Sequence, residues 1–420
     1  MARQMISTII GKGVKKVARL RGGGSALPGL VIEKIDPKFI QRTLKGLPQG
    51  VVIISGTNGK TTTTKIVVEL LESVGLRVFT NRTGSNFSRG VAAALLDEVN
   101  LRGKLEADIA VLELDEAWAV KFVQMVRPRF SLLLNVMRDQ LDRFGEIDNT
   151  ALLLQKIAEA TTDTVVLNRD DPRIFKISKH IQAKKVFFGT TDELLKLMPT
   201  DDSLKYGAAI ANQSVNVDVL LKKISGQEAT LRIDNKETAV NLKLTGVYNL
   251  LNAAAATALA RQITGPEVTD TILSALENIK PAFGRGETIF LNGTPIELIL
   301  VKNPSGFRLA LLSFAKNSSA TMIAVNDNYA DGRDVSWFWD VDFSALKKVA
   351  MVSGVRAYDM ALRLQYDEVA IEKIDTDIAR ALDDFINNSP EEPKQIFCSY
   401  TAMTAIRRLL GEKTDVEEIL

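Results

Sequence analysis

The chain has 420 residues, which suggests two or three domains, and its 46% hydrophobic and 25% charged residues are typical of soluble globular proteins. A net charge of +2 gives no overall reason to expect nucleic-acid binding, and no apolar run reaches the roughly 18 residues that indicate a membrane span. The single cysteine excludes a disulfide framework within the chain and favours a reducing, cytoplasmic location.

The first 46 residues form a basic N-terminal lead-in, in which six Lys and Arg residues precede the first acidic residue, Glu33. The apolar part of this segment is too short and too interrupted for a signal peptide. A solvated helix is the simpler interpretation. Weak attraction to the anionic inner face of the cell membrane is the alternative.

From residue 51 onward, short apolar runs alternate with helical patterns. This alternation predicts an α/β fold with a doubly wound, mostly parallel sheet that is covered on both faces. The predicted strands are 51–55, 77–81, 107–114, 130–136, 163–168 and 185–189, and the predicted helices include 60–74, 87–99 and 249–263.

Two changes of pattern divide the rest of the chain. Short alternating strands and turns at about 190–245 indicate a β-rich insertion or an extension of the sheet. A second α/β alternation follows "GRGETIFLNGTPIELILVKNP". We therefore predict a central domain at 47–288 and a smaller α/β C-terminal domain at 289–420.

The stretch "SGTNGKTTTT" lies where a buried strand is expected to end and a helix to begin. Backbone N–H groups and the helix dipole favour phosphate there, and Gly56 and Gly59 let the backbone approach closely. Lys60 can reach the β- and γ-phosphates, and Thr61 offers a hydroxyl to Mg²⁺. Ile54 occupies the usual first-glycine position, so the loop is a shortened variant. A plain Gly/Thr-rich helix cap is the alternative.

A nucleotide site also needs a second metal ligand. The run "AVLELDEA" ends a predicted strand on Glu113, Asp115 and Glu116. Carboxylates at the C-terminal end of a parallel strand face the crevice in which ligands bind. Glu113 is therefore the predicted Mg²⁺ ligand, and a solvated acidic turn is the alternative.

A series of motifs then resembles a known family. The order "GTNGKTTT", "LELDEA", "NVMRDQLDRFGE", "LNRDDP", "GVYNLLNAAAA" and "FGRGE" is similar to that of the Mur ligases and folylpolyglutamate synthetases, and the resemblance covers about residues 45–420. These are ATP-dependent enzymes that form amide bonds. The resemblance implies the Mur-ligase central and C-terminal domains.

Further motifs resemble one branch, the MurT family: "GGGSALPG", "NRTGSN", "VKNPSGF", "NDNYADGRDVSWFWD", "SGVRAYDMALRL" and "YTAM". MurT is the Mur-ligase-like subunit of lipid II isoglutaminyl synthase, and GatD is its glutaminase partner. The pair converts the α-carboxylate of D-glutamate in the peptidoglycan stem peptide into an amide. The resemblance therefore implies a lipid II substrate and a GatD-like partner in a heterodimer.

The resemblance also implies roles for individual residues. An acyl phosphate would form from ATP with Lys60 and Glu113 at the reacting phosphate, and Thr61 and Glu113 would hold Mg²⁺. Asn249 would meet the adenine and Arg285 the phosphates. ATP would be held by Gly56, Thr57, Asn58, Gly59, Lys60, Thr61 and Thr62.

The sequence departs from the family in two places. MurT proteins usually carry a four-cysteine zinc ribbon, but about 190–235 contains no cysteine, so we expect no zinc and an insertion held by packing alone. Gln140 stands where the Mur-ligase consensus has histidine. Many Mur ligases use a carbamylated lysine, and Lys156 lies nearby without a certain register.

The source of ammonia is a separate question, because a glutaminase uses a Cys thiolate with a His base. The chain has one of each. Cys398 lies in a strand-like apolar run and is expected to be buried, and His180 lies in a Lys-rich helical pattern and is expected to be exposed. We therefore predict that ammonia comes from another chain or from free ammonium.

The acidic, aromatic run at 326–340 is predicted to follow the strand "TMIAVN". In the MurT family, the MurT subunit supplies the carboxylate that completes the catalytic Cys–His pair of the glutaminase partner. The motif match implies Asp334, with Asp331 and Asp340 as alternatives, and exposed Trp residues as part of the docking surface. An acidic loop over packed tryptophans is the structural alternative.

Two other functions remain open at this point. One is a stand-alone ligase that adds an amino acid, although Lys302 stands where such ligases carry acidic or aromatic residues and His. The other is a nucleotide-binding regulatory protein, which the intact Lys60, Thr61 and Glu113 disfavour.

Overall fold

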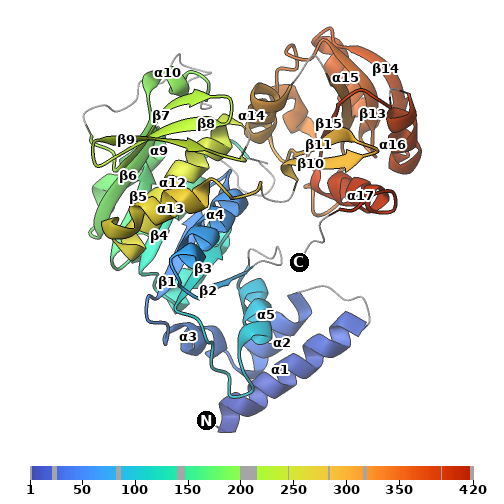
Figure 1. Ribbon diagram of the computed structural model, residues 1–420. Coiled ribbons are helices and arrows are strands. Elements are labelled where there is room, and N and C mark those ends of the chain that lie inside the picture. The colour runs from blue at the N-terminus through green and yellow to red at the C-terminus, as the bar shows by residue number, and fades with distance from the viewer. Residues whose placement is uncertain are drawn as a thin grey trace.

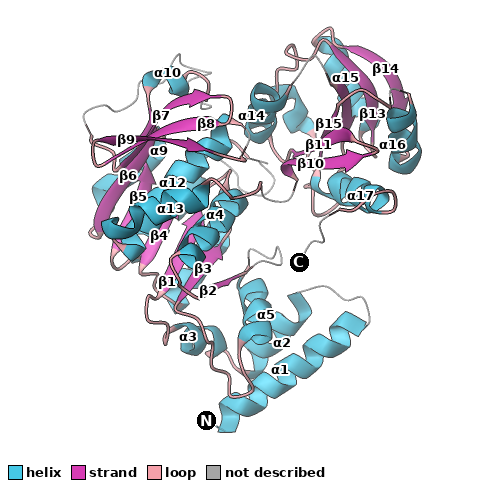
Figure 2. Cartoon of the chain, viewed as in Figure 1, coloured by secondary structure: helices cyan, strands magenta, loops and turns pink. Residues whose placement is uncertain are grey.

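The computed structural model describes residues 2–20, 26–81, 87–139, 147–198, 215–244, 246–281, 284–315, 319–388 and 390–416. Two α/β units, each built on its own sheet, lie side by side, and a helical N-terminal segment lies at the far end of the first unit (Figures 1 and 2). No helix in these ranges is long and apolar enough to cross a membrane.

The first sheet has nine strands in the order β2-β3-β1-β4-β5-β6-β7-β8-β9. Strands β1 to β7 are parallel, and β7, β8 and β9 are antiparallel. The strands are β1 Val51–Ser55, β2 Val78–Thr80, β3 Ile109–Glu113, β4 Phe130–Leu133, β5 Thr164–Asn168, β6 Lys184–Thr190, β7 Val219–Ser225, β8 Glu228–Ile233 and β9 Lys236–Asn241.

Helices cover both faces of this sheet, as the continuous apolar strands predict. In β1, Val52 and Ile54 pack on one face and Val51 and Ile53 on the other. The first face is covered by α4 Lys60–Ser73, α12 Val247–Thr264 and α13 Thr269–Leu276. The second is covered by α2 Ala26–Ile35, α3 Phe39–Leu44, α5 Ser88–Glu98, α6 Glu116–Met125, α8 Ile147–Ala160 and α9 Pro172–Ile177.

The doubly wound sheet predicted from the sequence is confirmed, and all six predicted strands and the three predicted helices are present within a few residues of their expected ends. The β-rich segment is an extension of the sheet, because β7 adds to β6 in parallel and a meander follows. Residues 199–214 of that segment lie outside the described residues. Short elements complete this unit: η1 Ser178–His180, α10 Asp192–Leu195 and η2 Pro266–Val268.

The second sheet has six strands in the order β10-β11-β15-β12-β13-β14, and only β10 runs antiparallel to its neighbour. The predicted domain boundary between residues 288 and 289 falls inside β10. The elements are β10 Arg285–Leu291, β11 Thr294–Leu300, α14 Pro304–Phe314, β12 Ala320–Ala324, η3 Ser336–Asp340, β13 Lys348–Ser353, α15 Ala357–Tyr366, β14 Ala370–Asp375, α16 Ile378–Asn387, β15 Lys394–Cys398 and α17 Tyr400–Gly411.

The N-terminal lead-in is helical where it is described. Its first helix, α1 Ala2–Leu20, packs on α2, and α2 packs on α5 of the first unit (Figure 1). The backbones of α2 and α5 lie close together at Gly29, where an added Cβ would lie 1.9 Å from the backbone oxygen of Arg89. The residue before α5 is Phe87.

Gly29→Ala should reduce the free energy of unfolding by about 1–3 kcal/mol, because the methyl group must push α2 away from the α5 backbone. Gly13→Ala is the matched control, since its Cβ would meet nothing within 4 Å and alanine favours a helix by up to about 1 kcal/mol. Urea denaturation of both variants measures the difference. Equal stability of the two variants would contradict the close contact between α2 and α5.

Candidate active site

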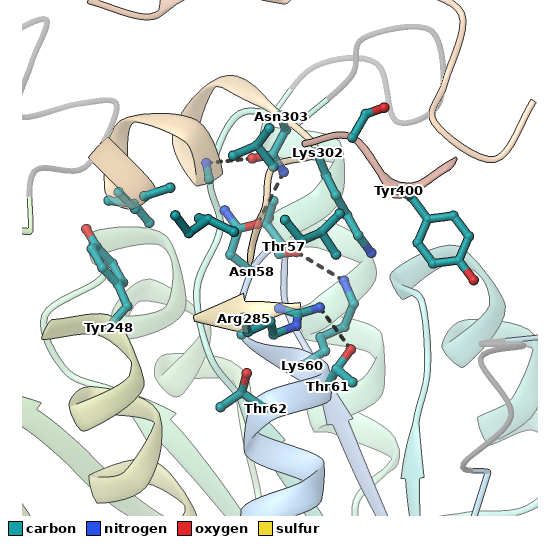
Figure 3. A pocket seen from close by; sticks show the side chains of 18 of the residues that line it. Thr57, Asn58, Lys60, Thr61, Thr62, Tyr248, Arg285, Lys302, Asn303 and Tyr400 are labelled. Atoms are coloured by element: carbon teal, nitrogen blue, oxygen red, sulfur yellow. Dashed lines mark hydrogen bonds between the residues drawn. The ribbon is translucent and has the colours of Figure 1, made fainter. Parts of the chain in front are cut away.

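A cleft of about 1580 Å³ lies between the two units. It is lined by the loop after β1, by the ends of β3 and β11, and by the segment between β12 and η3. The carboxyl ends of parallel strands are the usual place for ligands in such sheets. Figure 3 shows side chains from both units converging there, with Tyr248 and Tyr400 on opposite sides.

The loop between β1 and α4 has the backbone expected of a phosphate-binding loop. Gly56 and Gly59 have φ values of 135° and 89°, which disfavour any residue with a Cβ. A Cβ on Gly59 would lie 2.6 Å from the Asn252 Oδ1 atom. The side chain of Asn135 holds the loop from below: its Oδ1 accepts a hydrogen bond from the Asn58 N–H, and its Nδ2 donates to the Asn58 carbonyl, both at 2.9 Å.

The two residues predicted to bind Mg²⁺ lie together. The Thr61 hydroxyl donates to Glu113 Oε1 at 3.0 Å, and Arg285 Nη2 donates to the same hydroxyl at 3.1 Å. Two neighbouring oxygen ligands about 2.1 Å from an octahedral Mg²⁺ lie about 3.0 Å apart, and both oxygens belong to the class that Mg²⁺ prefers. The donor set therefore fits this ion.

Three cationic side chains enter the same part of the cleft: Lys60 from α4, Arg285 from β10 and Lys302 from the segment after β11 (Figure 3). Burial acts to lower the pKa of Lys60, but nearby carboxylates, Glu116 foremost, leave it above its ordinary value. Burial, aided by the charges of Arg285 and Lys60, lowers the pKa of Lys302 to about 8. Such a set can neutralise a triphosphate.

The three acidic residues at and after the end of β3 have different surroundings. Glu113 contacts Thr61, and Asp115 caps α6 by accepting from the Ala117 N–H. Glu116 is 2% exposed, and its Oε1 lies 3.6 Å from the Lys60 ammonium. Burial raises the pKa of Glu116 to about 7. Glu116 thus balances part of the charge of Lys60, a role that the sequence did not distinguish.

Asn303 joins the two units, and the sequence analysis did not identify it. Its Nδ2 donates to Asn58 Oδ1 at 3.2 Å and to Asp139 Oδ1 at 3.0 Å, and its Oδ1 caps α14 through the Gly306 N–H at 2.7 Å. Asparagine followed by proline is a helix-start signature. That signature predicts the cap but not the second contact, which spans 245 residues of sequence.

Other residues implied by the family resemblance also line the cleft. Asn249 and Tyr248 lie at the start of α12, and Thr57, Thr61 and Thr62 line the same cleft from the phosphate loop and the start of α4. Residue 140, at the consensus histidine position, lies outside the described part of the chain. Lys156 lies on α8, exposed and away from the residues that line the cleft.

The acidic loop after β12 places its three candidate carboxylates differently. Asp331 lines the cleft and accepts hydrogen bonds from the Thr401 N–H at 2.8 Å and from its hydroxyl. Asp340 pairs with Arg138 of the first unit at 3.1 Å. Asp334 accepts from the Ser336 N–H at 2.9 Å and is not among the residues that line the cleft.

The aromatic residues of this loop divide between core and surface. Trp337 is buried against Phe307, whereas Trp339 is half exposed and lies edge-on to Tyr366, with ring centroids 5.0 Å apart. The structural alternative, tryptophans packed beneath an acidic loop, therefore holds for Trp337. Trp339 remains available to solvent.

The two residues of a glutaminase are far from forming a pair. Cys398 is fully buried at the end of β15, and burial raises the pKa of its thiol far above the ordinary value. His180 is exposed at the end of η1 in the first unit. Among the described residues, no group of three His, Cys, Asp or Glu side chains is placed to hold a metal ion.

Comparison with known proteins agrees with this fold. Residues 54–260 match the Mur ligase middle domain, and residues 300–403 match the MurT ligase C-terminal domain. The fold is similar to MurF from Acinetobacter baumannii, with a TM-score of 0.69 and 20% identity over 92% of this chain and 80% of that one. It is also similar to MurF from Thermotoga maritima in complex with ADP, with a TM-score of 0.63 and 17% identity over 91% and 83%.

The fold and the cleft thus define a ligase of the Mur type. A relative in Streptococcus pneumoniae, the lipid II isoglutaminyl synthase (glutamine-hydrolyzing) subunit MurT, is 32% identical over 432 residues, covering 94% of both chains. Together with the C-terminal match, this shows that the chain belongs to the MurT family.

Thr61→Val should weaken binding of a nucleoside triphosphate in the presence of Mg²⁺ by at least about tenfold, because it removes a hydroxyl ligand at the metal position. Thr63→Val is the matched control on the same helix. The buried Thr63 hydroxyl has no hydrogen-bond partner in the described structure, so its removal should be neutral or stabilising. Titration calorimetry measures both affinities. An equal loss in both variants would indicate general damage to α4.

Proposed function

We propose that this chain is the synthetase subunit of an enzyme that uses ATP to convert the α-carboxylate of D-glutamate in the lipid II stem peptide into an amide. The proposal rests on one observation above all: Thr61 of the phosphate loop, Glu113 of β3 and Arg285 of β10 are in hydrogen-bond contact across the cleft. The name of the Streptococcus pneumoniae relative supports the substrate and the reaction.

The chemistry begins with the activation of a carboxylate, whose hydroxide is a poor leaving group. A carboxylate oxygen of the substrate attacks the γ-phosphorus of ATP, the bond to the β–γ bridging oxygen breaks, and an acyl phosphate and ADP result. Lys60, Arg285 and Lys302 balance the charge on the transferring phosphoryl group. Mg²⁺ held by Thr61 and Glu113 would supply further neutralisation at that group.

Ammonia then attacks the acyl carbon, inorganic phosphate leaves with the bonding electrons of the C–O bond, and the proton that the nitrogen loses is taken up by the released phosphate. Cys398 cannot generate this ammonia from glutamine, because its buried thiol resists ionisation and His180 lies in the other unit. The ammonia therefore comes from a GatD-like glutaminase partner. The relative's name, which describes a glutamine-hydrolysing enzyme with subunits, supports a partner of this kind.

An aromatic face on the second unit suits this partner. Four exposed side chains follow one side of α15 and the turn before it: Val355, Tyr358, Leu362 and Tyr366. Each is at least half exposed, and Trp339 lies against Tyr366. Large exposed aromatic residues are favoured at protein interfaces. Asp334 lies in the same loop as Trp339, outside the cleft, from where its carboxylate could orient the imidazole of the glutaminase.

Lys60→Ala should lower ammonium-dependent amidation by about a thousandfold, because it removes a charge that stabilises the transferring phosphoryl group. Lys156→Ala is the control, since Lys156 is exposed on α8 and lies outside the cleft. Phosphate release with a muropeptide and ammonium measures both variants. Activity of Lys60→Ala near the wild-type rate would refute the phosphate-loop assignment. Turnover with free amino acids in place of ammonium would favour a stand-alone amino acid ligase.

Asp334→Asn should lower glutamine-dependent amidation by the two-subunit complex by about a hundredfold or more, while sparing the ammonium-dependent rate and complex formation. The substitution keeps the size of the side chain and removes its charge. Asp270→Asn, at an exposed position on α13 of the first unit, is a control for general loss of negative charge.

Paired assays with glutamine and with ammonium separate the possible roles of Asp334. Equal loss of both activities would move Asp334 into the ATP or acyl site, and loss of neither would leave it a structural residue of the loop. The chain without its partner should not hydrolyse glutamine. Hydrolysis by the isolated chain would overturn the assignment of Cys398 and His180.

A further inference from the structure

Helix α1 buries its polar face and exposes its apolar face, which is the reverse of an ordinary surface helix. Its inward face carries small and polar residues: Ser7, Thr8 and Gly11 are buried. The Ser7 hydroxyl donates to Asp36 at 2.9 Å, and a Cβ on Gly11 would lie 2.7 Å from the Leu96 side chain. These small residues let α1 lie close against α2 and α5.

The outward face of α1 carries the large apolar residues. Their spacing in the sequence places them on one side of a helix, and each is between 41% and 54% exposed. The set consists of Met5, Ile6, Ile9, Ile10 and Val17. Helices of soluble proteins normally turn such a stripe toward the core. Here the core-facing positions are already filled, and the apolar stripe points away from the protein.

The charges of α1 are all of one sign. The helix spans 19 residues and contains no Asp or Glu. Lys16 is exposed beside the apolar stripe. Lys15 is held at the edge of the helix, where its ammonium donates to the Ala93 carbonyl at 2.7 Å and pairs with Asp97. An apolar stripe with basic flanks is the pattern of a helix that lies in the interface of an anionic membrane.

We propose that the outward face of α1 docks on an anionic lipid surface and so brings the cleft to a lipid-anchored substrate. The charge selects this occupant. A second copy of the chain would place two basic helices without acidic residues against each other, which is unfavourable, whereas anionic headgroups complement Lys16 and cover the apolar stripe. The part of the proposal that concerns the substrate rests on the proposed function.

Helix α5 lies between this surface and the cleft. Helix α2 packs on α1 and on α5, and it is tied to α5 by the hydrogen bond from Ser88 to Glu33 at 2.9 Å. Phe87, which directly precedes α5, lines the cleft. A head group that extends from a lipid surface under α1 would therefore approach the cleft on its β2–α5 side (Figure 1).

The test uses the full chain, alone and in complex with its glutaminase partner, and vesicles without added nucleotide. The wild-type protein should co-sediment with vesicles of phosphatidylcholine and phosphatidylglycerol in equal parts, and much less with phosphatidylcholine alone. Ile6→Ser combined with Ile9→Ser should weaken binding to the mixed vesicles by at least about tenfold. Lys16→Gln should weaken it by about fivefold.

A matched pair of substitutions controls for the loss of exposed apolar surface. Leu152→Ser combined with Leu197→Ser removes two side chains that are 56% and 51% exposed, on or beside α8 and α10, and should leave vesicle binding unchanged. Circular dichroism and thermal melting establish that each variant is folded.

Three results would overturn the proposal: no binding of the wild type to the mixed vesicles, equal binding by the Ile6/Ile9 variant, or a dimer that depends on α1 and is not dispersed by vesicles. Amidation assays separate this inference from the proposed function. The Ile6/Ile9 variant should amidate a soluble muropeptide normally but lose several-fold activity on lipid II in vesicles. Vesicle binding without amidation of either substrate by the wild type would contradict the proposed function alone.

Discussion

The contact between the phosphate loop and the second α/β unit is the constraint on which the rest of the site depends. Asn303 both caps α14 and donates to Asn58 in the loop, and Arg285 reaches Thr61 from the first strand of the second sheet. Neither unit alone contributes all of the charged and polar side chains that line the cleft. The site therefore exists only when the two units are held together, and the hydrogen bonds that hold them are made by residues of the site itself.

Electrostatics explains why so many charges can be buried in one cleft. Lys60 is balanced by Glu116 and its neighbours, so its ammonium keeps its charge despite burial. Lys302 is buried next to other cations, which lowers its pKa. A highly charged anion bound beside it would therefore stabilise its protonated form. A triphosphate would thus strengthen the association of the two units, because each unit contributes cations to it. The contribution of cations by both units explains why a triphosphate would bind between the two units rather than within one of them.

Two exposed apolar surfaces of the molecule lie on different parts of the chain. The thiol of Cys398 is part of the core, and the aromatic face of α15 and Trp339 is open on the second unit. The apolar stripe of α1 lies at the other end of the chain, on the N-terminal helical layer (Figure 1). A source of ammonia on one unit and a lipid surface on the other would both serve a cleft that lies between them.

The sequence by itself determined the first sheet, the glycine-containing loop between β1 and α4, and the proximity of Thr61 and Glu113. These follow from local patterns: short β-branched apolar runs such as 51–55, bounded by glycine, predict buried strands, and glycines next to Lys60 and Thr61 permit the geometry of the turn. The end of a parallel strand also fixes the direction in which Glu113 points. The separate roles of Asp115 and Glu116, in contrast, could not be distinguished, because both follow the strand in the same acidic run and only their tertiary contacts differ.

Only the tertiary structure decided which distant residues meet and which face of a helix is exposed. Asn303 and Asn58 are 245 residues apart, and no local pattern records that their side chains share a hydrogen bond. The periodicity of α1 shows an apolar stripe, but a stripe of this kind usually faces inward. Its outward orientation depends on the close packing of Ser7, Thr8 and Gly11 against α2 and α5, which is a property of the folded chain rather than of the helix.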